Sequence, residues 1–282
     1  MSGRRPLREV IAEHGLAARK SLGQHFLLDP ALLARIAREA SPLAGRHVIE
    51  IGPGPGGLTR ALLDAGVASL TAIERDARFL AALAELVAES GGRLRVLEGD
   101  ALGIDVTALA PPPRAIVSNL PYNIATPLLV GWLRDIAAFE SLTLMFQAEV
   151  AERIVAGPSS SGYGRLAVLA QWVAEPRIAL RLPPRAFTPP PKVASALVRL
   201  VPRPHQPGRA LFAAMERLTA TAFGQRRKML RAALRPLGEA DALLAEAGIA
   251  GDRRAETLSV AEFDRLARLM LARWPPPAPP TR

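Results

Sequence analysis

Short apolar runs alternate with amphipathic segments from residue 47 to residue 155. The runs are rich in β-branched residues, and they predict strands because strands of a parallel sheet are buried on both faces. They cover residues 47–51, 69–73, 94–97, 114–118 and 142–146. Apolar positions at helical spacing lie between and after them, in residues 58–65, 77–89, 127–134 and 149–155. The alternation predicts an α/β fold built on a parallel, doubly wound sheet.

The segment before this region is predicted to be helical. Residues 6–16 read as a short helix, and a second helix starts at Asp29-Pro30. Asp is a favoured N-cap residue and Pro a favoured first helical residue, and an apolar stripe with helical period follows them.

The pattern changes again after residue 155. Residues 177–182 and 195–200 predict two antiparallel strands joined by a proline-rich bend. Beyond a linker at residues 202–208 the pattern is helical to about residue 273, which predicts a small all-helical domain. We therefore expect a first domain at residues 1–202, a helical domain at 203–274, and a disordered proline-rich tail at 275–282.

Composition adds an expected partner. The 282 residues carry a net charge of +10, and the sequence pI is about 11.2. Such an excess favours a polyanionic partner, nucleic acid before a membrane surface. The absence of cysteine excludes disulfides and thiolate chemistry, and the four scattered histidines lack ligand spacing, so no metal site is expected.

The sequence also bears on location. Residues 1–10 lack the apolar core of a secretory signal. No uncharged apolar run approaches the roughly 18 residues of a membrane span. A cytoplasmic protein without membrane association is the expectation.

A glycine-rich turn at residues 50–59 (EIGPGPGGLT) joins the first strand to a helix. Glycines at 52, 54 and 57 let a ligand approach the backbone closely. Glu50 places a negative charge beside the turn, which disfavours a pyrophosphate and favours a cationic ligand. A nicotinamide-dependent oxidoreductase is therefore a poor alternative.

Two further acidic residues end the next strands. Glu74 follows the second strand and could accept both ribose hydroxyls, and Asp100 follows the third and could accept from an adenine amine. Ligands of open α/β sheets bind at the carboxyl ends of strands. The three acids beside the turn suit S-adenosylmethionine, which combines a sulfonium, an amino acid, a ribose and an adenine. A plain tight turn with solvated acids is the alternative.

The fourth strand ends in Asn119-Leu120-Pro121-Tyr122. The Asn side chain and the Leu120 carbonyl, left unpaired before a proline, offer two acceptors. Tyr122 offers a flat ring with a polar tip. Two acceptors beside a stacking ring suit the exocyclic amine of an adenine or cytosine that is flipped out of its stack. The alternative is a strand-ending turn with a half-buried tyrosine.

Two basic segments are candidate RNA contacts. The proline-rich stretch 187–195 (FTPPPKVAS) displays Phe187, which could cover the second face of a flipped base, and Lys192, which could meet a phosphate. Residues 224–231 (GQRRKMLR) predict a helix with a dense basic face and with Met229, Leu230 and Leu234 at core-like spacing. The alternatives are a core phenylalanine in a proline-rich connection and a solvated charged helix.

In this order, the motifs resemble those of the ribosomal RNA adenine dimethyltransferases of the small-subunit branch. They are KSLGQHFLLD (20–29), EIGPGPGGLT (50–59), IERD (73–76), GDAL (99–102), NLPY (119–122), FTPPPKVAS (187–195) and RRKML (226–230). The resemblance implies a Rossmann-like class I methyltransferase sheet, a small all-helical C-terminal domain and S-adenosylmethionine as methyl donor. It further implies dimethylation of two adjacent adenosines in a hairpin loop near the 3′ end of 16S rRNA, in the small ribosomal subunit during ribosome biogenesis.

The resemblance also assigns residues, and with the motifs above it gives three predicted sets. The cofactor set is His25, Leu27, Glu50, Gly52, Gly54, Glu74, Asp100, Ala101 and Asn119, and His25 stands where many relatives have Asn. The catalytic set is Asn119, Leu120, Pro121, Tyr122 and Phe187. The RNA-binding set is Lys20, Lys192, Arg226, Arg227, Lys228 and Arg231.

Two related functions stay open. Large-subunit methylases that confer macrolide resistance are similar, but they typically carry Ile where this chain has Leu120. A ribosome-assembly factor that acts mainly by binding rRNA would also use the basic segment. A monomer is expected in each case.

Overall fold

The computed structural model describes residues 5–18 and 24–273. Lys20 and the predicted tail at 275–282 lie outside these residues. The chain divides into two compact units. The first is drawn from Met1–Gly131, Ala137–Ala151 and Arg177–Pro202, and the second from Trp132–Ile136, Glu152–Pro176 and Arg203–Arg282.

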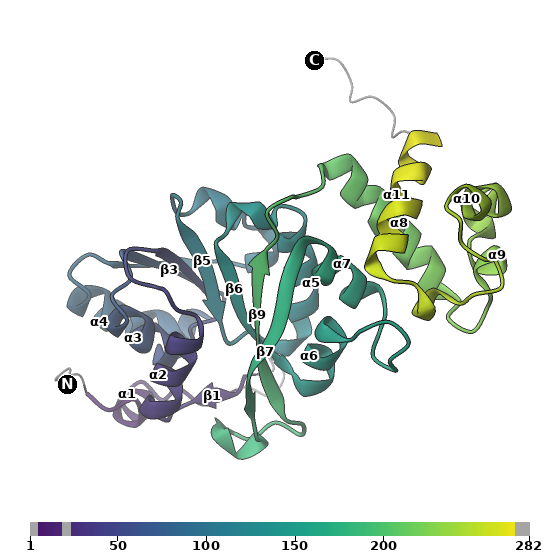
Figure 1. Cartoon of the computed structure of the whole chain (residues 1–282). Coiled ribbons are helices and arrows are strands. Elements are labelled where there is room, and N and C mark those ends of the chain that lie inside the picture. The colour runs from purple at the N-terminus through teal and green to yellow at the C-terminus, as the bar shows by residue number, and fades with distance from the viewer. Residues whose placement is uncertain (1–4, 19–23, 274–282) are drawn as a thin grey trace. The chain divides into compact units, whose positions relative to one another are not determined.

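The first unit is built on a seven-stranded sheet in the order β4-β3-β2-β5-β6-β9-β7 (Figure 1). Its strands are β2 (His47–Ile51), β3 (Ser69–Glu74), β4 (Leu94–Glu98), β5 (Arg114–Ser118), β6 (Ser141–Gln147), β7 (Ala174–Leu182) and β9 (Ser195–Pro202). Strands β2 to β6 pair in parallel, and β9 pairs antiparallel with β6. The prediction of a parallel sheet with an antiparallel end is confirmed.

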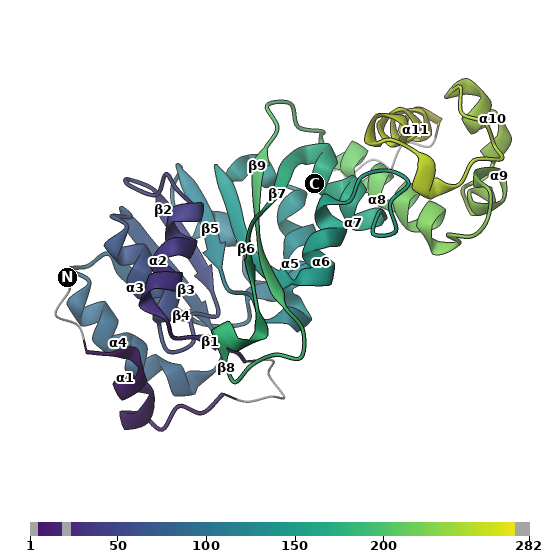
Figure 2. The same cartoon turned by 60° about the horizontal axis from the view of Figure 1, so that its bottom comes forward.

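Helices cover both faces of this sheet (Figure 2). Helices α2 (Pro30–Glu39), α3 (Gly57–Asp64) and α4 (Leu80–Glu89) lie on one face, and α5 (Tyr122–Leu133) lies on the other. Asp29 caps α2 as predicted, since its side chain accepts a hydrogen bond from the backbone N–H of Ala31 at 2.9 Å. The short helix α1 (Leu7–Glu13) precedes them.

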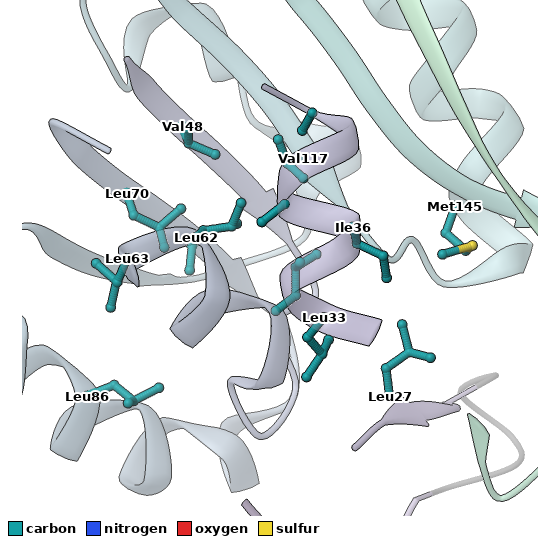
Figure 3. Packing of buried hydrophobic residues seen from close by; sticks show 14 of the residues in the cluster. Leu27, Leu33, Ile36, Val48, Leu62, Leu63, Leu70, Leu86, Val117 and Met145 are labelled. Carbon is teal, nitrogen blue, oxygen red and sulfur yellow. The ribbon is translucent and has the colours of Figure 1, made fainter. Parts of the chain in front are cut away.

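The core on the α2 side shows why the chain takes this fold. Leu33 and Ile36 of α2 pack with Leu62 of α3 against Val48 and Val117 of the sheet (Figure 3). Side chains alternate between the faces of a strand, so the residue after Val48, Ile49, points to the other face, and it is fully buried there. Both faces are therefore apolar, as the unbroken hydrophobic runs predicted.

One predicted helix starts earlier than expected. The prediction placed this helix at residues 127–134, whereas α5 begins at Tyr122 and holds Pro127 inside it. Ala125, which precedes the proline, is buried like Leu128 after it, so the residues before the proline already contribute to the apolar face.

The second unit is helical. It includes α7 (Arg165–Val173), α8 (Arg209–Gly224), α9 (Leu230–Ala233), α10 (Ala240–Glu246) and α11 (Val260–Arg273). Helices α8 and α11 lie side by side (Figure 1), and the rings of Phe223 and Phe263 stack between them at 5.6 Å. Helix α6 (Ala148–Val155) follows β6 as predicted, whereas α7 is an element that the periodicity did not reveal.

A two-stranded sheet brings distant segments together in the first unit. β1 (Phe26–Leu27) pairs antiparallel with β8 (Phe187–Thr188). It joins the segment after the first helix to the proline-rich stretch. No helix in the described part of the chain is long and apolar enough to span a membrane.

Candidate active site at the strand ends

A cavity of about 340 Å³ opens at the carboxyl ends of β2, β3 and β5, and we call it the strand-end cavity. Most of the predicted site residues line this cavity, although they lie far apart in the sequence. Its lining includes His25, Leu27, Glu50, Gly52, Gly54, Glu74, Asp100, Ala101, Asn119, Leu120, Pro121 and Tyr122. Of the predicted catalytic and cofactor residues, Phe187 alone is absent from this lining.

The glycine-rich turn has the backbone that only glycine adopts easily. Gly54 has φ +55° and Gly56 has φ +86°. A Cβ on Gly56 would stand 2.5 Å from Cδ1 of Leu86 of α4, so a side chain there would force the buried Leu86 side chain to shift. The turn therefore lets α3 start close against α4, while the backbone of Gly54 borders the cavity.

Glu50 ends up almost fully buried, at 2% exposure. Its Oε2 accepts a hydrogen bond from Thr59 Oγ1 at 2.8 Å, and no other described residue bonds its carboxylate. Burial raises the pKa of Glu50 to about 8, and the nearby Glu74 adds to the rise. The carboxyl is thus mostly protonated at neutral pH, which corrects the expected negative charge, and a cation in the cavity would favour its ionised form.

Glu74 braces the glycine-rich turn. Its Oε2 accepts from the backbone N–H of Gly54 at 3.0 Å, and its Oε1 accepts from the N–H of Asp76 at 2.8 Å. Burial raises the pKa of Glu74, although these hydrogen bonds oppose the rise. The carboxylate lines the cavity at the end of β3. This is the position from which we predicted it to accept hydrogen bonds from ribose hydroxyls.

Asp76 and Gln24 belong to the cavity lining but are missing from the predicted set. Asp76 Oδ2 accepts from Gln24 Nε2 at 3.0 Å, and the Arg78 guanidinium holds the pKa of Asp76 down at about 2. Both residues stand in the motifs IERD and KSLGQHFLLD. The signal was therefore present, but their contact spans 52 positions and is not visible in the sequence.

Asp100 lies at the rim of the cavity. Its Oδ1 accepts from the N–H of Leu102 at 3.1 Å, and its Oδ2 lies 3.3 Å from Nη1 of the exposed Arg75. An exposed ion pair of this kind contributes little stability, so a ligand can compete for the carboxylate.

Asn119 and Leu120 present two acceptors. Asn119 Nδ2 donates to the His25 carbonyl oxygen at 3.3 Å, which leaves Oδ1 as an acceptor. Among the described residues, none donates a hydrogen bond to the Leu120 carbonyl oxygen. Ser118 Oγ donates to the Ile51 carbonyl at 2.6 Å and ties the ends of β5 and β2 together. The motif therefore starts from a fixed strand end.

Tyr122 is held on two sides. Its hydroxyl lies 2.6 Å from Ser195 Oγ, and its ring stacks with that of His25 at 5.8 Å and 29°. His25 Nδ1 lies 2.8 Å from the Pro189 carbonyl oxygen, so Nδ1 is the nitrogen that donates. Burial raises the pKa of Tyr122, so its hydroxyl stays protonated.

The structure does not bring Phe187 to the strand-end cavity. Its side chain is 2% exposed and belongs to the hydrophobic core, where β8 sets it opposite Leu27. The expected stacking on a base is not available in this conformation, because the ring has no free face. Lys192 is exposed, as predicted.

The basic segment forms a turn, and the predicted helix is wrong. Helix α8 ends at Gly224, and Gln225 leaves the helical region with φ −127° and ψ 55°. The N–H of Leu230 then donates to the Arg253 carbonyl at 2.7 Å, and Met229 forms a β-bridge with Arg254. We call residues 225–231 the basic turn, although its last two residues, Leu230 and Arg231, already belong to α9.

The side chains of the basic turn divide into two kinds. Arg226 donates to Glu256 Oε2 at 3.0 Å and to the carbonyls of Ser161 and Tyr163, each at 2.9 Å. Arg227, Lys228 and Arg231 are exposed, and no ion pair links them to another described residue. Met229 is 43% exposed rather than in the core, whereas Leu230 and Leu234 are fully buried as expected.

The described residues contain no group of three or more acidic or histidine side chains arranged for a metal ion.

Comparison with known proteins places this fold among the class I methyltransferases. A dimethyladenosine transferase from Plasmodium falciparum superposes with a TM-score of 0.71 at 25% identity, covering 86% of this chain and 96% of that one. The 23S rRNA methyltransferase ErmE superposes with a TM-score of 0.66 at 29% identity, covering 87% and 99%.

The sequence comparison gives the family. The model of the family described as ribosomal RNA adenine dimethylase matches residues 15–271, so the chain belongs to that family and is an rRNA adenine dimethyltransferase. The chain is 59% identical to the ribosomal RNA small subunit methyltransferase A of Gluconobacter oxydans, over 94% of this chain and 88% of that protein. It is 60% identical to the protein of the same name from Ruegeria pomeroyi, over 93% and 96%.

Proposed function

We propose that this enzyme transfers methyl groups from S-adenosylmethionine to two adjacent adenosines in the 3′-terminal hairpin loop of 16S rRNA, twice to each exocyclic amine. The observation that carries the proposal is the pair of acceptors at Asn119 and Leu120 beside Tyr122, at the edge of an acid-lined cavity. The small-subunit substrate is supported by relatives named for it that are 59% and 60% identical. The enzyme would act as a cytoplasmic monomer during ribosome biogenesis.

The residues of the strand-end cavity fit S-adenosylmethionine. The cavity volume of about 340 Å³ lies within the range of roughly 300–1,000 Å³ that small-molecule sites take up. Glu50 keeps one carboxyl oxygen without a partner among the described residues, and it would face a cationic part of the cofactor. Glu74 and Asp100 would hold the ribose and adenine, and the bare backbone of Gly52 and Gly54 leaves room. The cofactor would supply a methyl group on a positively charged sulfur.

The catalytic residues act by positioning. Asn119 Oδ1 and the Leu120 carbonyl oxygen would accept the two hydrogens of the adenine amine and turn its nitrogen toward the methyl donor. The amine lone pair is otherwise conjugated with the ring. Tyr122 would stack on the base, with His25 against the tyrosine ring.

No strong base is needed for this reaction, because a methylated ammonium on adenine loses its proton readily. The site agrees with that requirement. Glu50 is buried against Thr59, and the Tyr122 hydroxyl is engaged by Ser195. Neither group is placed to draw a proton from the substrate.

The basic residues would hold the RNA backbone. Lys192 and the three exposed cations of the basic turn, Arg227, Lys228 and Arg231, would meet phosphates. Arg226 was assigned the same role, but its guanidinium is occupied by Glu256 and two carbonyl groups. We therefore give it a structural role. Lys20 stays a predicted contact outside the described residues.

The experiment is transfer of labelled methyl groups to small ribosomal subunits that lack the modification, with large-subunit RNA in parallel. Product nucleosides are then separated. Dimethyladenosine on the small-subunit RNA alone is the expected result. Label on large-subunit RNA alone would place the enzyme with the resistance methylases, and tight binding without transfer would favour an assembly factor.

A further inference from the structure

Ser195 has a contact that no assigned role explains. It is the first residue of β9, it is fully buried, and its Oγ lies 2.6 Å from the Tyr122 hydroxyl. The strand holds Ser195 firmly, because it pairs with Gln147 of β6 and the N–H of Ala148 donates to the Ala194 carbonyl at 2.9 Å. A hydroxyl group in a fixed position thus contacts the hydroxyl of Tyr122 in the active site.

The tyrosine depends on this contact. Tyr122 is the first residue of α5, and it is partly buried. Its hydroxyl has no other polar partner among the described residues. A hydroxyl that is shielded from water is destabilised when it loses its partner, so the ring would turn to recover one.

We propose that Ser195 is a positioning residue for methyl transfer, because it anchors the Tyr122 hydroxyl and so sets the plane of the ring that stacks on the target base. The inference rests on the proposed function, since it takes Tyr122 as the stacking platform. It also assigns two separate roles within Tyr122: the hydroxyl bonds Ser195, and the ring face stacks on the target base.

The neighbouring strand offers a matched control. Thr143 on β6 is fully buried too, but its Oγ1 has no hydrogen-bond partner in the described part of the chain. Thr143→Val removes a buried hydroxyl at nearly constant volume, so it tests the loss of a sheet hydroxyl without touching the active site.

The test compares Ser195→Ala, Tyr122→Phe, the double variant and Thr143→Val. Single-turnover methyl transfer is measured at saturating ribosomal substrate, together with the affinity for S-adenosylhomocysteine and the thermal midpoint. We expect Ser195→Ala and Tyr122→Phe each to lower the single-turnover rate about tenfold. The double variant should be no slower than Tyr122→Phe, and cofactor affinity and the Thr143→Val rate should stay unchanged.

Several results would overturn the inference. A full rate in Ser195→Ala would do so, as would losses in the two single variants that multiply in the double variant. A loss of cofactor affinity that accounts for the slower rate would show a general defect instead. Tyr122→Phe removes the same hydrogen bond with Ser195 in place, so the test survives if Ser195→Ala does not fold. A wild-type enzyme that methylates neither RNA would instead defeat the proposed function.

Discussion

The strand-end cavity and the basic turn are both polar, but they are built in opposite ways. In the cavity, Glu74 and Asn119 are fixed by hydrogen bonds to backbone groups of neighbouring loops. In the basic turn, Arg227 and Lys228 stand in solvent without an ion pair to another described residue. Fixed, buried groups control geometry, whereas free surface charges contribute mainly through their sum and are screened by salt.

This difference predicts that the two regions have different functions. Changes in the cavity should alter the rate of the chemical step or the number of protons released when a ligand binds. Changes in the exposed part of the basic turn should alter RNA affinity and its salt dependence.

Asn119→Ala should have the largest effect. It removes one of the two acceptors for the adenine amine while the fold of the strand end stays in place. Loss of one fixed hydrogen-bonding group in an active site typically costs about 10²–10³ in rate. Single-turnover methyl transfer measures this directly, and RNA affinity should stay within about twofold. Full activity would exclude the positioning role.

Glu50→Gln should change how stability depends on pH. The pKa of Glu50 is raised by burial from 4.5 to about 8. Between these values the folded protein keeps a proton that the unfolded chain has lost, so the wild-type protein loses stability as pH rises through this window, by up to about 1.4 kcal/mol per pH unit. Thermal midpoints from pH 5.5 to 8 should fall less steeply in the variant. Parallel curves would show that Glu50 is already ionised.

The same carboxyl should link cofactor binding to proton release. A positive charge near Glu50 favours its ionised form, so S-adenosylmethionine should release protons on binding near pH 7. S-adenosylhomocysteine lacks the sulfonium charge and should release fewer. Calorimetric titration in two buffers of different ionisation enthalpy measures the number, and equal release for the two ligands would argue against a contact with the sulfonium.

The basic turn should respond through affinity. Replacing Arg227 and Lys228 together by Ala removes two free cations, so the slope of log affinity against log salt should fall by roughly 1.5, with about tenfold weaker binding. Arg226→Ala is the internal contrast, because it breaks contacts to Glu256, Ser161 and Tyr163. It should lower the thermal midpoint more than the double variant does. Equal salt slopes for the double variant and the wild type would rule out a phosphate contact.

Glu262→Gln should have the smallest effect. Its carboxylate accepts from the N–H and hydroxyl of Ser259 at the start of α11 and pairs with Arg253, which holds its pKa at about 2. Because this pKa is depressed, the stabilisation is present above pH 4.5 and is lost as pH falls toward 2. We expect a loss of about 1 kcal/mol at pH 7 that shrinks by pH 4, the opposite trend to Glu50→Gln. A constant loss at both pH values would contradict the charge-based explanation.

The sequence predicted the site residues whose positions are set by the sheet. Glu50, Glu74 and Asn119 end strands that the hydrophobic pattern identified, and parallel pairing brings the carboxyl ends of strands to one edge. The sequence alone therefore predicted that the acids and the two acceptors lie together at this edge of the sheet.

Contacts between distant segments were not predictable. The β1–β8 pairing buries Phe187, and the bridge between Met229 and Arg254 makes the basic segment a turn. The Tyr122–Ser195 contact spans 73 positions. Protonation of Glu50 also escaped prediction, because it depends on burial rather than on residue type.

We expect the strand-end cavity to perform the chemistry and the basic turn to supply RNA affinity. The decisive experiment is single-turnover methyl transfer over a range of small-subunit concentrations, with Asn119→Ala beside the Arg227→Ala/Lys228→Ala variant. The basic-turn variant should reach the wild-type rate at saturation, whereas Asn119→Ala should stay slow at every concentration. A basic-turn variant that stays slow at saturation, or an Asn119→Ala rate that recovers there, would contradict it.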